Sequence, residues 1–140
     1  MQIRKAKIKE LDAIVKMSCA LQQLHHQQDN FHFTSVSKAK AGIKRQIKSL
    51  IYSRYAMVMV AEDKKTGSLI GYIIAKLVYV NQEQLLPKIK GRVVALYIIP
   101  EYRKKRVGGK LLADVSKWLR AKGAKELSLT VAKWNKNAID

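Results

Sequence analysis

The sequence predicts an α/β protein built on a mixed β-sheet flanked by helices, in the order β-α-α-β-β-β-α-β. Three observations predict this fold class. Apolar residues recur at helical spacing in two stretches before residue 52. Two apolar runs separated by a glycine-containing turn then indicate a hairpin, and residues 91–131 follow the pattern strand, basic glycine loop, helix, strand. At 140 residues the chain has the length of a single domain with a real core.

The first part of the chain should supply one strand and two helices. Residues 2–8 alternate apolar and basic side chains, as a strand with one exposed face does. Apolar residues then mark one face of a helix: Leu11, Ile14, Val15, Leu21 and Leu24. A second helix carries the apolar stripe Ile43, Ile47, Leu50 and Ile51. Polar residues before it are N-cap candidates, namely Thr34, Ser35 and Ser37.

The middle of the chain should form an antiparallel hairpin. Residues 56–61 and 69–80 are apolar runs of strand length. Gly67, in the polar turn between them, suits a left-handed backbone conformation. Residues 81–90 are expected to be a polar connection that leads into the next strand.

The last predicted unit is a strand, a helix and a second strand. Residues 91–99 are apolar on both faces, which is typical of a central strand, and Pro100 ends it because proline has no N–H for the ladder. Helical spacing of apolar residues begins at Val107, and Gly123 is the expected stop. Residues 127–131 alternate again as a strand, so the unit should be a right-handed parallel crossover.

The loop before the predicted helix has features that favour the binding of an anion. The first backbone N–H groups of a helix have no partner inside it, and the helix dipole adds partial positive charge at the same place. Gly108 and Gly109 allow a ligand to come close to the backbone, and four side chains add full charges: Arg103, Lys104, Lys105 and Arg106. The pattern predicts a phosphate cradle; a solvated basic turn before an ordinary helix is the alternative.

The run Ile98–Leu112 (IIPEYRKKRVGGKLL) resembles the acetyl-CoA-binding motif of the GNAT superfamily of N-acetyltransferases. That motif is a strand ending V-x-P-x-x-R/Q-x-x-G-x-G/A, followed by a helix with paired leucines. Arg106 stands at the first glycine position, where its side chain must point away from the pyrophosphate or bind it. Asn135 begins an N-x-x-A of the kind that such proteins carry after their fifth strand. The order of the predicted elements matches the family as well, so the resemblance covers the whole chain.

The resemblance implies an acetyl-CoA-dependent N-acetyltransferase that passes the acetyl group directly to an amine, which is a protein N-terminus, a lysine or a small molecule. It assigns these residues to the cofactor: Leu96, Tyr97, Ile98, Arg103, Lys104, Lys105, Arg106, Val107, Gly108, Gly109, Lys110 and Asn135. The positions that carry a glutamate base in some members hold no carboxylate here. The catalytic base is therefore unknown, and water stays open beside three side chains: His25, His26 and Glu62.

The residues between the two predicted helices are candidates for the acceptor side of the cleft. GNAT proteins commonly line that side with this segment, so the resemblance assigns four residues to substrate binding: His25, Asp29, Phe31 and Phe33. An ordinary loop anchored by its aromatic residues is the alternative. A metal site is not expected, because adjacent histidines on a helix diverge by about 100° and no further ligand pair completes a set.

Composition bounds the remaining possibilities. The net charge of +18 creates a field that attracts polyanions, so non-specific binding of nucleic acid is expected at low salt. The chain has one cysteine, Cys19, which excludes an internal disulfide and fits a reducing compartment. No apolar run is long enough to span a membrane, and the sequence predicts a cytoplasmic protein.

The chain is expected to be one N-acetyltransferase domain, 1–140, that lacks the last helix and hairpin of the family pattern. The strand over residues 127–131 would then be an apolar edge, through which we expect either dimerisation, as a homodimer, or aggregation. The alternative function is a non-catalytic domain of the same fold that binds coenzyme A or nucleic acid.

Overall fold

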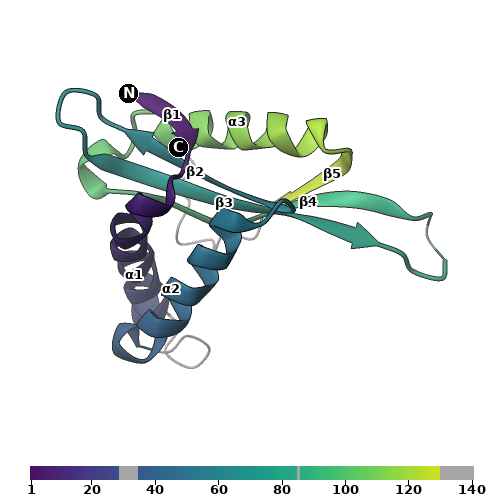
Figure 1. The fold of residues 1–140 in the computed structure, drawn as a ribbon, viewed down its shortest axis with the longest axis horizontal. Helices are drawn as coiled ribbons and strands as arrows, with labels where there is room; N and C mark the ends of the chain where they lie inside the picture. Colours follow the sequence, from purple (N-terminus) through teal and green to yellow (C-terminus); the bar gives the residue numbers. More distant parts are fainter. Residues whose placement is uncertain (29–34, 85, 130–140) are drawn as a thin grey trace.

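The computed structural model describes residues 1–28, 35–84 and 86–129. In this part of the chain a single sheet holds the strands in the spatial order β1-β2-β3-β4-β5 (Figure 1). The strands are β1 (Gln2–Lys5), β2 (Ala56–Glu62), β3 (Leu69–Val80), β4 (Lys88–Ile98) and β5 (Ala124–Leu129). The helices are α1 (Leu11–Gln28), α2 (Val36–Tyr52) and α3 (Val107–Ala121), with short 3₁₀ turns η1 (Ile8–Glu10) and η2 (Pro100–Tyr102).

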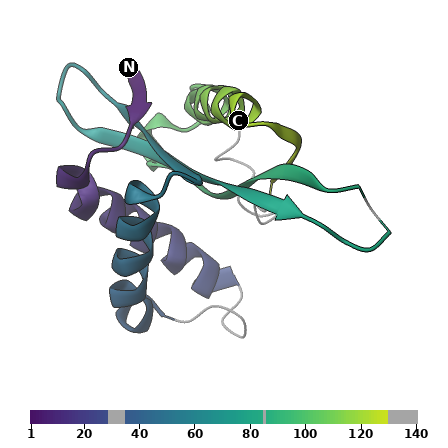
Figure 2. The same cartoon turned by 45° about the vertical axis from the view of Figure 1, so that its right-hand side comes forward.

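The sheet carries helices on both faces, and each face has its own hydrophobic core. Helices α1 and α2 lie together on one face and α3 lies on the other (Figures 1 and 2). The α1 side is centred on apolar residues of the helices and of alternate strand positions, among them Ile14, Leu21, Ile47, Val58 and Tyr72. The α3 side is centred on Ile73, Leu96, Leu111, Val115 and Leu119. The predicted β-α-α-β-β-β-α-β order and the mixed sheet are confirmed. None of the helices in the described ranges is long and apolar enough to cross a membrane.

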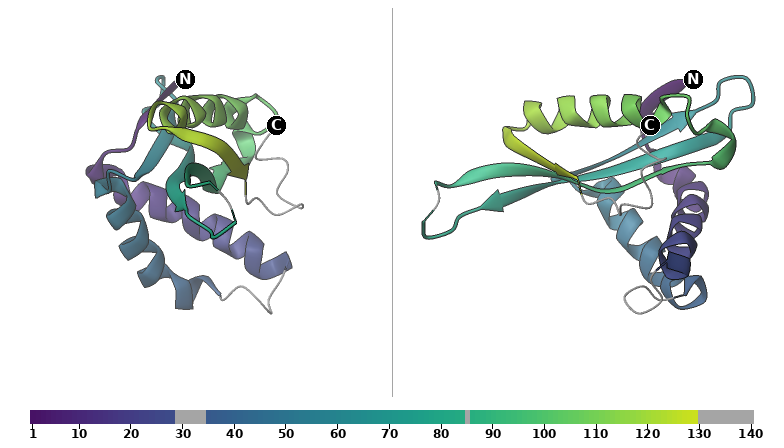
Figure 3. Two further views of the ribbon diagram at one scale, coloured as in Figure 1. Left: turned by 90° about the vertical axis from the view of Figure 1, so that its right-hand side faces the viewer. Right: turned by 180° about the vertical axis from the view of Figure 1, so that it is seen from behind.

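The predicted boundaries of three strands were wrong by more than one residue. β1 ends at Lys5 where the prediction extended to residue 8, β5 begins at Ala124 where residue 127 was predicted, and the start of β4 also differs. Residues 81–90 were expected to be a polar connection, but β4 begins at Lys88, and its pairing with β3 continues to Val80 opposite Lys88. Polar side chains can extend this ladder because the hairpin projects beyond the helices, as the view from behind shows (Figure 3), so neither face of it needs to be apolar.

The pairing of β4 changes along its length. Strands β1 to β4 are antiparallel to their neighbours, and β5 runs parallel to β4. Opposite β3, the partner of Ile74 is Ala95 and the partner of Ala75 is Val93, so Val94 forms a bulge. The described pairing of β5 with β4 ends at Val93 opposite Leu129. Within the described residues, β4 from Val94 onward is therefore paired on its β3 side alone.

We predict that Gly71→Ala destabilises the sheet at the end of β4. A Cβ at this buried position would lie 2.6 Å from Cδ1 of Ile98 and 3.0 Å from the carbonyl oxygen of Tyr97. Overpacking against backbone lowers the free energy of unfolding by about 1–3 kcal/mol, which urea unfolding measures. The matched control is Gly42→Ala on exposed α2, where a Cβ meets only the Arg45 guanidinium at 3.9 Å. This change should stabilise by about 0.5–1 kcal/mol, and equal effects at both positions would contradict the prediction.

Candidate active site

The loop from Arg103 to Arg106 joins the end of β4 to α3 and has a strained backbone. Lys104 and Arg106 have φ values of 61° and 64°, in the left-handed region that favours glycine. Arg106 is the N-cap of α3, and its ψ is 17°. Glycine adopts this left-handed conformation without strain, which fits the glycine that the GNAT motif has at the position of Arg106.

The first turn of α3 has backbone donors that have no partner inside the helix. The first bond of the helix ladder joins the amide of Lys110 to the carbonyl oxygen of Arg106, at 3.1 Å. The amides of Val107, Gly108 and Gly109 therefore have no partner inside the helix. A Cβ built on Gly109 would meet nothing within 4 Å, so there is open space beside this residue. The loop and the first turn also carry exposed cations: Lys104, Lys105, Arg106 and Lys110. Free amides and cations at a helix N-terminus favour an anion, and the phosphate cradle stays a prediction.

Arg103 ties this loop to β4. Its Nε donates a hydrogen bond to the carbonyl oxygen of Ile98 at 2.9 Å, and its guanidinium lies 5.4 Å from the centre of the Tyr97 ring. Arg103 therefore fixes the anion cradle relative to the last residues of the central strand. Its predicted contact with the cofactor stays a prediction.

The residues of β4 that were assigned to the cofactor can offer it backbone groups. The side chains of Leu96 and Ile98 are buried in the α3-side core, and Tyr97 is buried on the α1 side. Their backbones lie on the part of β4 that, among the described residues, has no partner on the side of β5. An unpaired strand edge next to a helix N-terminus can bind the amides of an extended ligand and its phosphates at once.

A polar contact anchors the other side of the loop. The hydroxyl of Tyr102 in η2 donates to Oδ2 of Asp63 in the turn between β2 and β3. This bond lowers the pKa of Asp63 and raises that of Tyr102, since it favours the ionised carboxylate and the protonated phenol. Lys105 lies over the Tyr102 ring, with Nζ 5.3 Å from its centre. The loop is thus held at Ile98 and at Asp63, on either side of the cradle.

A second hollow, of about 600 Å³, lies on the α1 side of the end of β4; we call it the α1 pocket. It is lined by Lys9, Glu10, Ala13, Lys16, Met17 and Ala20 from η1 and α1, by Gly67, Ser68 and Leu69, and by Tyr97 and Ile99. The small residues among them, such as Ala13 on the helix and Gly67 on the opposite wall, leave an open space between α1 and the sheet. Apart from Tyr97 and Ile99, which belong to the predicted cofactor segment, no sequence motif marked these residues, because they come from three separate segments and meet only in the fold.

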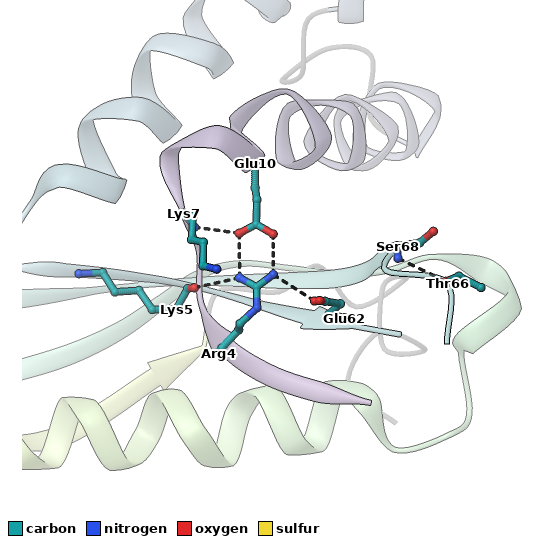
Figure 4. A network of polar contacts seen from close by, with 7 residues as sticks. All are labelled: Arg4, Lys5, Lys7, Glu10, Glu62, Thr66 and Ser68. Carbon is teal, nitrogen blue, oxygen red and sulfur yellow. Dashed lines mark hydrogen bonds and ion pairs between the residues drawn. The ribbon is translucent and has the colours of Figure 1, made fainter. Parts of the chain in front are cut away.

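Glu10 belongs to a network at the rim of the α1 pocket (Figure 4). The Arg4 guanidinium donates to both of its oxygens, at 2.8 and 2.7 Å, and the Lys7 amide donates to Oε1 at 2.9 Å. Arg4 also pairs with Glu62 at 3.3 Å. The bond from Arg4 is the main reason that the pKa of Glu10 lies below its usual range, so the carboxylate stays ionised and already has its partners.

The predicted acceptor residues are only partly described. His25 lies in the last turn of α1, where burial lowers its pKa, and it does not line the α1 pocket. Asp29, Phe31 and Phe33, and also the predicted cofactor residue Asn135, lie outside the described residues. Glu62, one of the open candidates for a base, is paired with Arg4. In the described ranges, no group of three histidine, cysteine or acidic residues could hold a metal ion.

Comparison with known proteins gives a consistent result. The profile of the Acetyltransferase (GNAT) family matches residues 21–140. A thialysine N-epsilon-acetyltransferase from Bos taurus is 41% identical over 54 residues, which cover 36% of this chain and 32% of the bovine protein. The match thus spans about a third of that relative's length.

Solved structures share the fold over nearly the whole chain. An acetyltransferase from Vibrio fischeri has a TM-score of 0.76 and 26% identity, covering 97% of this chain and 98% of that one. A mutant protein from Bacillus halodurans reaches a TM-score of 0.87 at 15% identity, over 99% and 87% of the two chains. An aminoglycoside 6'-N-acetyltransferase from Acinetobacter haemolyticus has a TM-score of 0.72 at 16% identity, over 96% and 82%. The last two show the fold alone.

We predict that Glu10→Gln destabilises the protein in a pH-dependent way. Loss of the paired charge lowers the free energy of unfolding at pH 7 by about 1–2 kcal/mol. Folding lowers the pKa of Glu10 from its unfolded value near 4.5. The stabilisation by the ionised carboxylate is therefore present above pH 4.5 and is lost as the pH falls through the pKa of the folded state. Urea unfolding should therefore show the difference shrinking as the pH falls below 4.5. A constant difference down to pH ~2 would contradict this reason.

The control for this prediction is Glu101→Gln, at an exposed side chain of η2. This substitution should change the free energy of unfolding by less than about 0.5 kcal/mol, both at pH 7 and at acidic pH.

Proposed function

Because the chain belongs to the GNAT family of acetyltransferases, we propose that it transfers an acetyl group from acetyl-CoA to the nitrogen of an amine by direct attack. The observation that carries the proposal is one juxtaposition. The part of β4 without a described partner beyond Val93 lies at the loop that leads to the first turn of α3, where Gly109 leaves the backbone open. A long ligand with amide groups at one end and phosphates at the other fits this pair of features.

Different residues of the chain would bind different parts of acetyl-CoA. The amides of Val107–Gly109, the positive end of α3 and the exposed cations of the loop would bind the pyrophosphate. The backbone of Leu96–Ile98 would pair with the amides of the pantetheine arm, as an added strand does. The pyrophosphate contact uses backbone amides beside the loop cations, so the exposed side chain of Arg106 at a glycine position is compatible with binding.

The chemistry needs little beyond positioning. The attacking amine must be neutral, so its proton leaves to a base or to a chain of waters. Charge develops on the carbonyl oxygen of the acetyl group, and a backbone N–H at the end of β4, near Ile98, is the donor that the family resemblance implies. The sulfur leaves as a thiolate and takes a proton. We assign no side chain as the base, because Glu10 and Glu62 are already paired with Arg4.

The acceptor approaches from the α1 side of β4 in this proposal. The α1 pocket ends at Tyr97 and Ile99, beside the strand that would hold the thioester, and α3 covers the opposite face. The bovine relative acts on the ε-amine of thialysine, according to its name. An amine at the end of a flexible chain is accordingly the acceptor class that we propose.

A thermal-shift titration with acetyl-CoA tests the cofactor part of the proposal, run beside coenzyme A, ATP and heparin. A ligand at about 100 times its Kd adds about 2.7 kcal/mol to stability, which shifts the melting temperature by several degrees. A shift specific to acetyl-CoA and coenzyme A supports the site. Equal shifts with ATP and heparin would mean that the +18 charge binds any polyanion, and the site assignment would fail.

We predict opposite effects of Gly109→Ala on stability and on cofactor affinity. The Cβ has free space and replaces a helical glycine, so the free energy of unfolding should rise by about 0.5–1 kcal/mol. The same methyl group occupies the place where a phosphate must approach, so the affinity for acetyl-CoA should fall about tenfold or more. Urea unfolding and isothermal titration measure the two effects.

Gly42→Ala is the control, since it also replaces a helical glycine but lies on α2. It should stabilise the protein and leave the affinity for acetyl-CoA unchanged. Unchanged affinity in Gly109→Ala as well would place the pyrophosphate elsewhere.

A further inference from the structure

The charges around the α1 pocket are unbalanced. Two lysines line it, Lys9 from η1 and Lys16 from α1, and the carboxylate among its described lining residues is Glu10. Glu10 receives hydrogen bonds from Arg4 and from the Lys7 amide, so its charge is already compensated. Within the described residues, neither Lys9 nor Lys16 forms a salt bridge.

The geometry places both cations around the same space. Residues of α1 that line the pocket recur at a spacing of three or four, at Ala13, Lys16, Met17 and Ala20, and so lie on one face of the helix. The alanines make room where a larger side chain would fill the gap. On the opposite wall, Gly67 and Ser68 contribute almost no side-chain bulk. The pocket is thus wide enough for a small molecule and has cations at its helical wall.

A third cation lies next to one of the lining residues. Tyr97 lines the pocket, and the guanidinium of Arg103 lies 5.4 Å from the centre of its ring. A positively charged acceptor group would meet the two lysines in the pocket, with Arg103 beside Tyr97, and no free carboxylate from the described residues. A negatively charged group would gain from the same arrangement, because Coulomb interactions at about 4 Å near a protein surface amount to about 1–4 kcal/mol.

From this arrangement we infer that the α1 pocket selects acceptors that carry an anionic group at the end opposite the reacting amine. Lys9 and Lys16 bind the anionic group, and the amine reaches β4 at Tyr97 and Ile99. Aminocarboxylates are the substrate class, and diamines are disfavoured. The inference rests on the proposed acetyl transfer, since it concerns the acceptor of that reaction.

The test compares three acceptors with the same six-carbon chain and the same reacting amine: 6-aminohexanoate, 6-aminohexanamide and 1,6-diaminohexane. Release of coenzyme A from acetyl-CoA is followed with the full chain. We expect kcat/KM for 6-aminohexanoate to exceed that for the amide by about tenfold, mainly through KM, and the diamine to be the poorest acceptor. Equal kcat/KM for the carboxylate and the amide, or a preference for the diamine, would overturn the inference and leave acetyl transfer in place.

The double variant Lys9→Gln, Lys16→Gln should abolish the preference, so that kcat/KM for the carboxylate falls to that for the amide in the same variant. The matched control removes two exposed lysines of α2, Lys38→Gln and Lys48→Gln, which changes the net charge equally but does not touch the α1 pocket. Equal losses in both double variants would mean that the overall field, and not the pocket, sets the preference, and would overturn the inference.

A binding measurement separates this inference from the proposed function. Isothermal titration of 6-aminohexanoate and of the amide into the protein saturated with coenzyme A does not depend on turnover. Absence of coenzyme A release with all three amines would overturn the proposed transfer. Tighter binding of the carboxylate, lost in the Lys9, Lys16 double variant, would still support the anion-selective pocket in that case. Equal binding of the two compounds would overturn it.

Discussion

The change in the pairing of β4 at Val94 is the constraint on which the candidate site depends. A buried backbone N–H or C=O needs a partner, and a strand inside a sheet normally finds one on each side. Here the bulge at Val94 and the end of the described β5 pairing at Val93 divide β4 into two parts. The first part is an ordinary interior strand. Among the described residues, the second part has β3 as its partner, and in the proposed site its other edge binds the amides of the ligand.

The rest of the loop and helix geometry maintains that division. The strand ends at Ile98, whose carbonyl oxygen accepts a hydrogen bond from Arg103, and η2 is held to the β2–β3 turn by Tyr102 and Asp63. With both ends fixed, the chain must turn sharply into α3, and Lys104 and Arg106 take left-handed conformations to do so. The strain at these residues is the cost of placing the N-terminus of a buried helix beside the end of a central strand.

Sequence alone predicted the fold because its local signals agree with one another. The apolar spacing of α3, the stop at Gly123 and the proline after β4 each define a boundary by backbone chemistry. The start of β4 was misplaced because the projecting hairpin needs no apolar face, so residues 88–90 carry no strand pattern. The helix N-terminus that follows the basic loop was also predictable, since it is a local feature, while the phosphate cradle there stays a prediction.

The α1 pocket could not be predicted in the same way. Its walls come from η1, α1, the β2–β3 turn and β4, and its shape depends on small residues such as Ala13 and Gly67 that have no distinctive pattern in sequence. The bulge at Val94 is equally invisible, because Val93–Leu96 is uniformly apolar and any register would bury it. Such features are set by how segments meet, and only the three-dimensional arrangement contains that information.

The net charge of +18 and the local charges of the α1 pocket act at different ranges. At physiological ionic strength the Debye length is about 8 Å, so distant lysines raise the local concentration of every anion without distinguishing one from another. Discrimination requires cations within a few ångströms of the ligand that have no carboxylate partner.

The chain has 28 lysines and arginines and 10 acidic residues, so cations without a carboxylate partner are common on its surface. Lys9 and Lys16 face a pocket whose carboxylate, Glu10, is already paired with Arg4. Selectivity for an anionic acceptor therefore follows from where Arg4 places its hydrogen bonds, and the overall basicity of the protein contributes mainly to the rate of encounter.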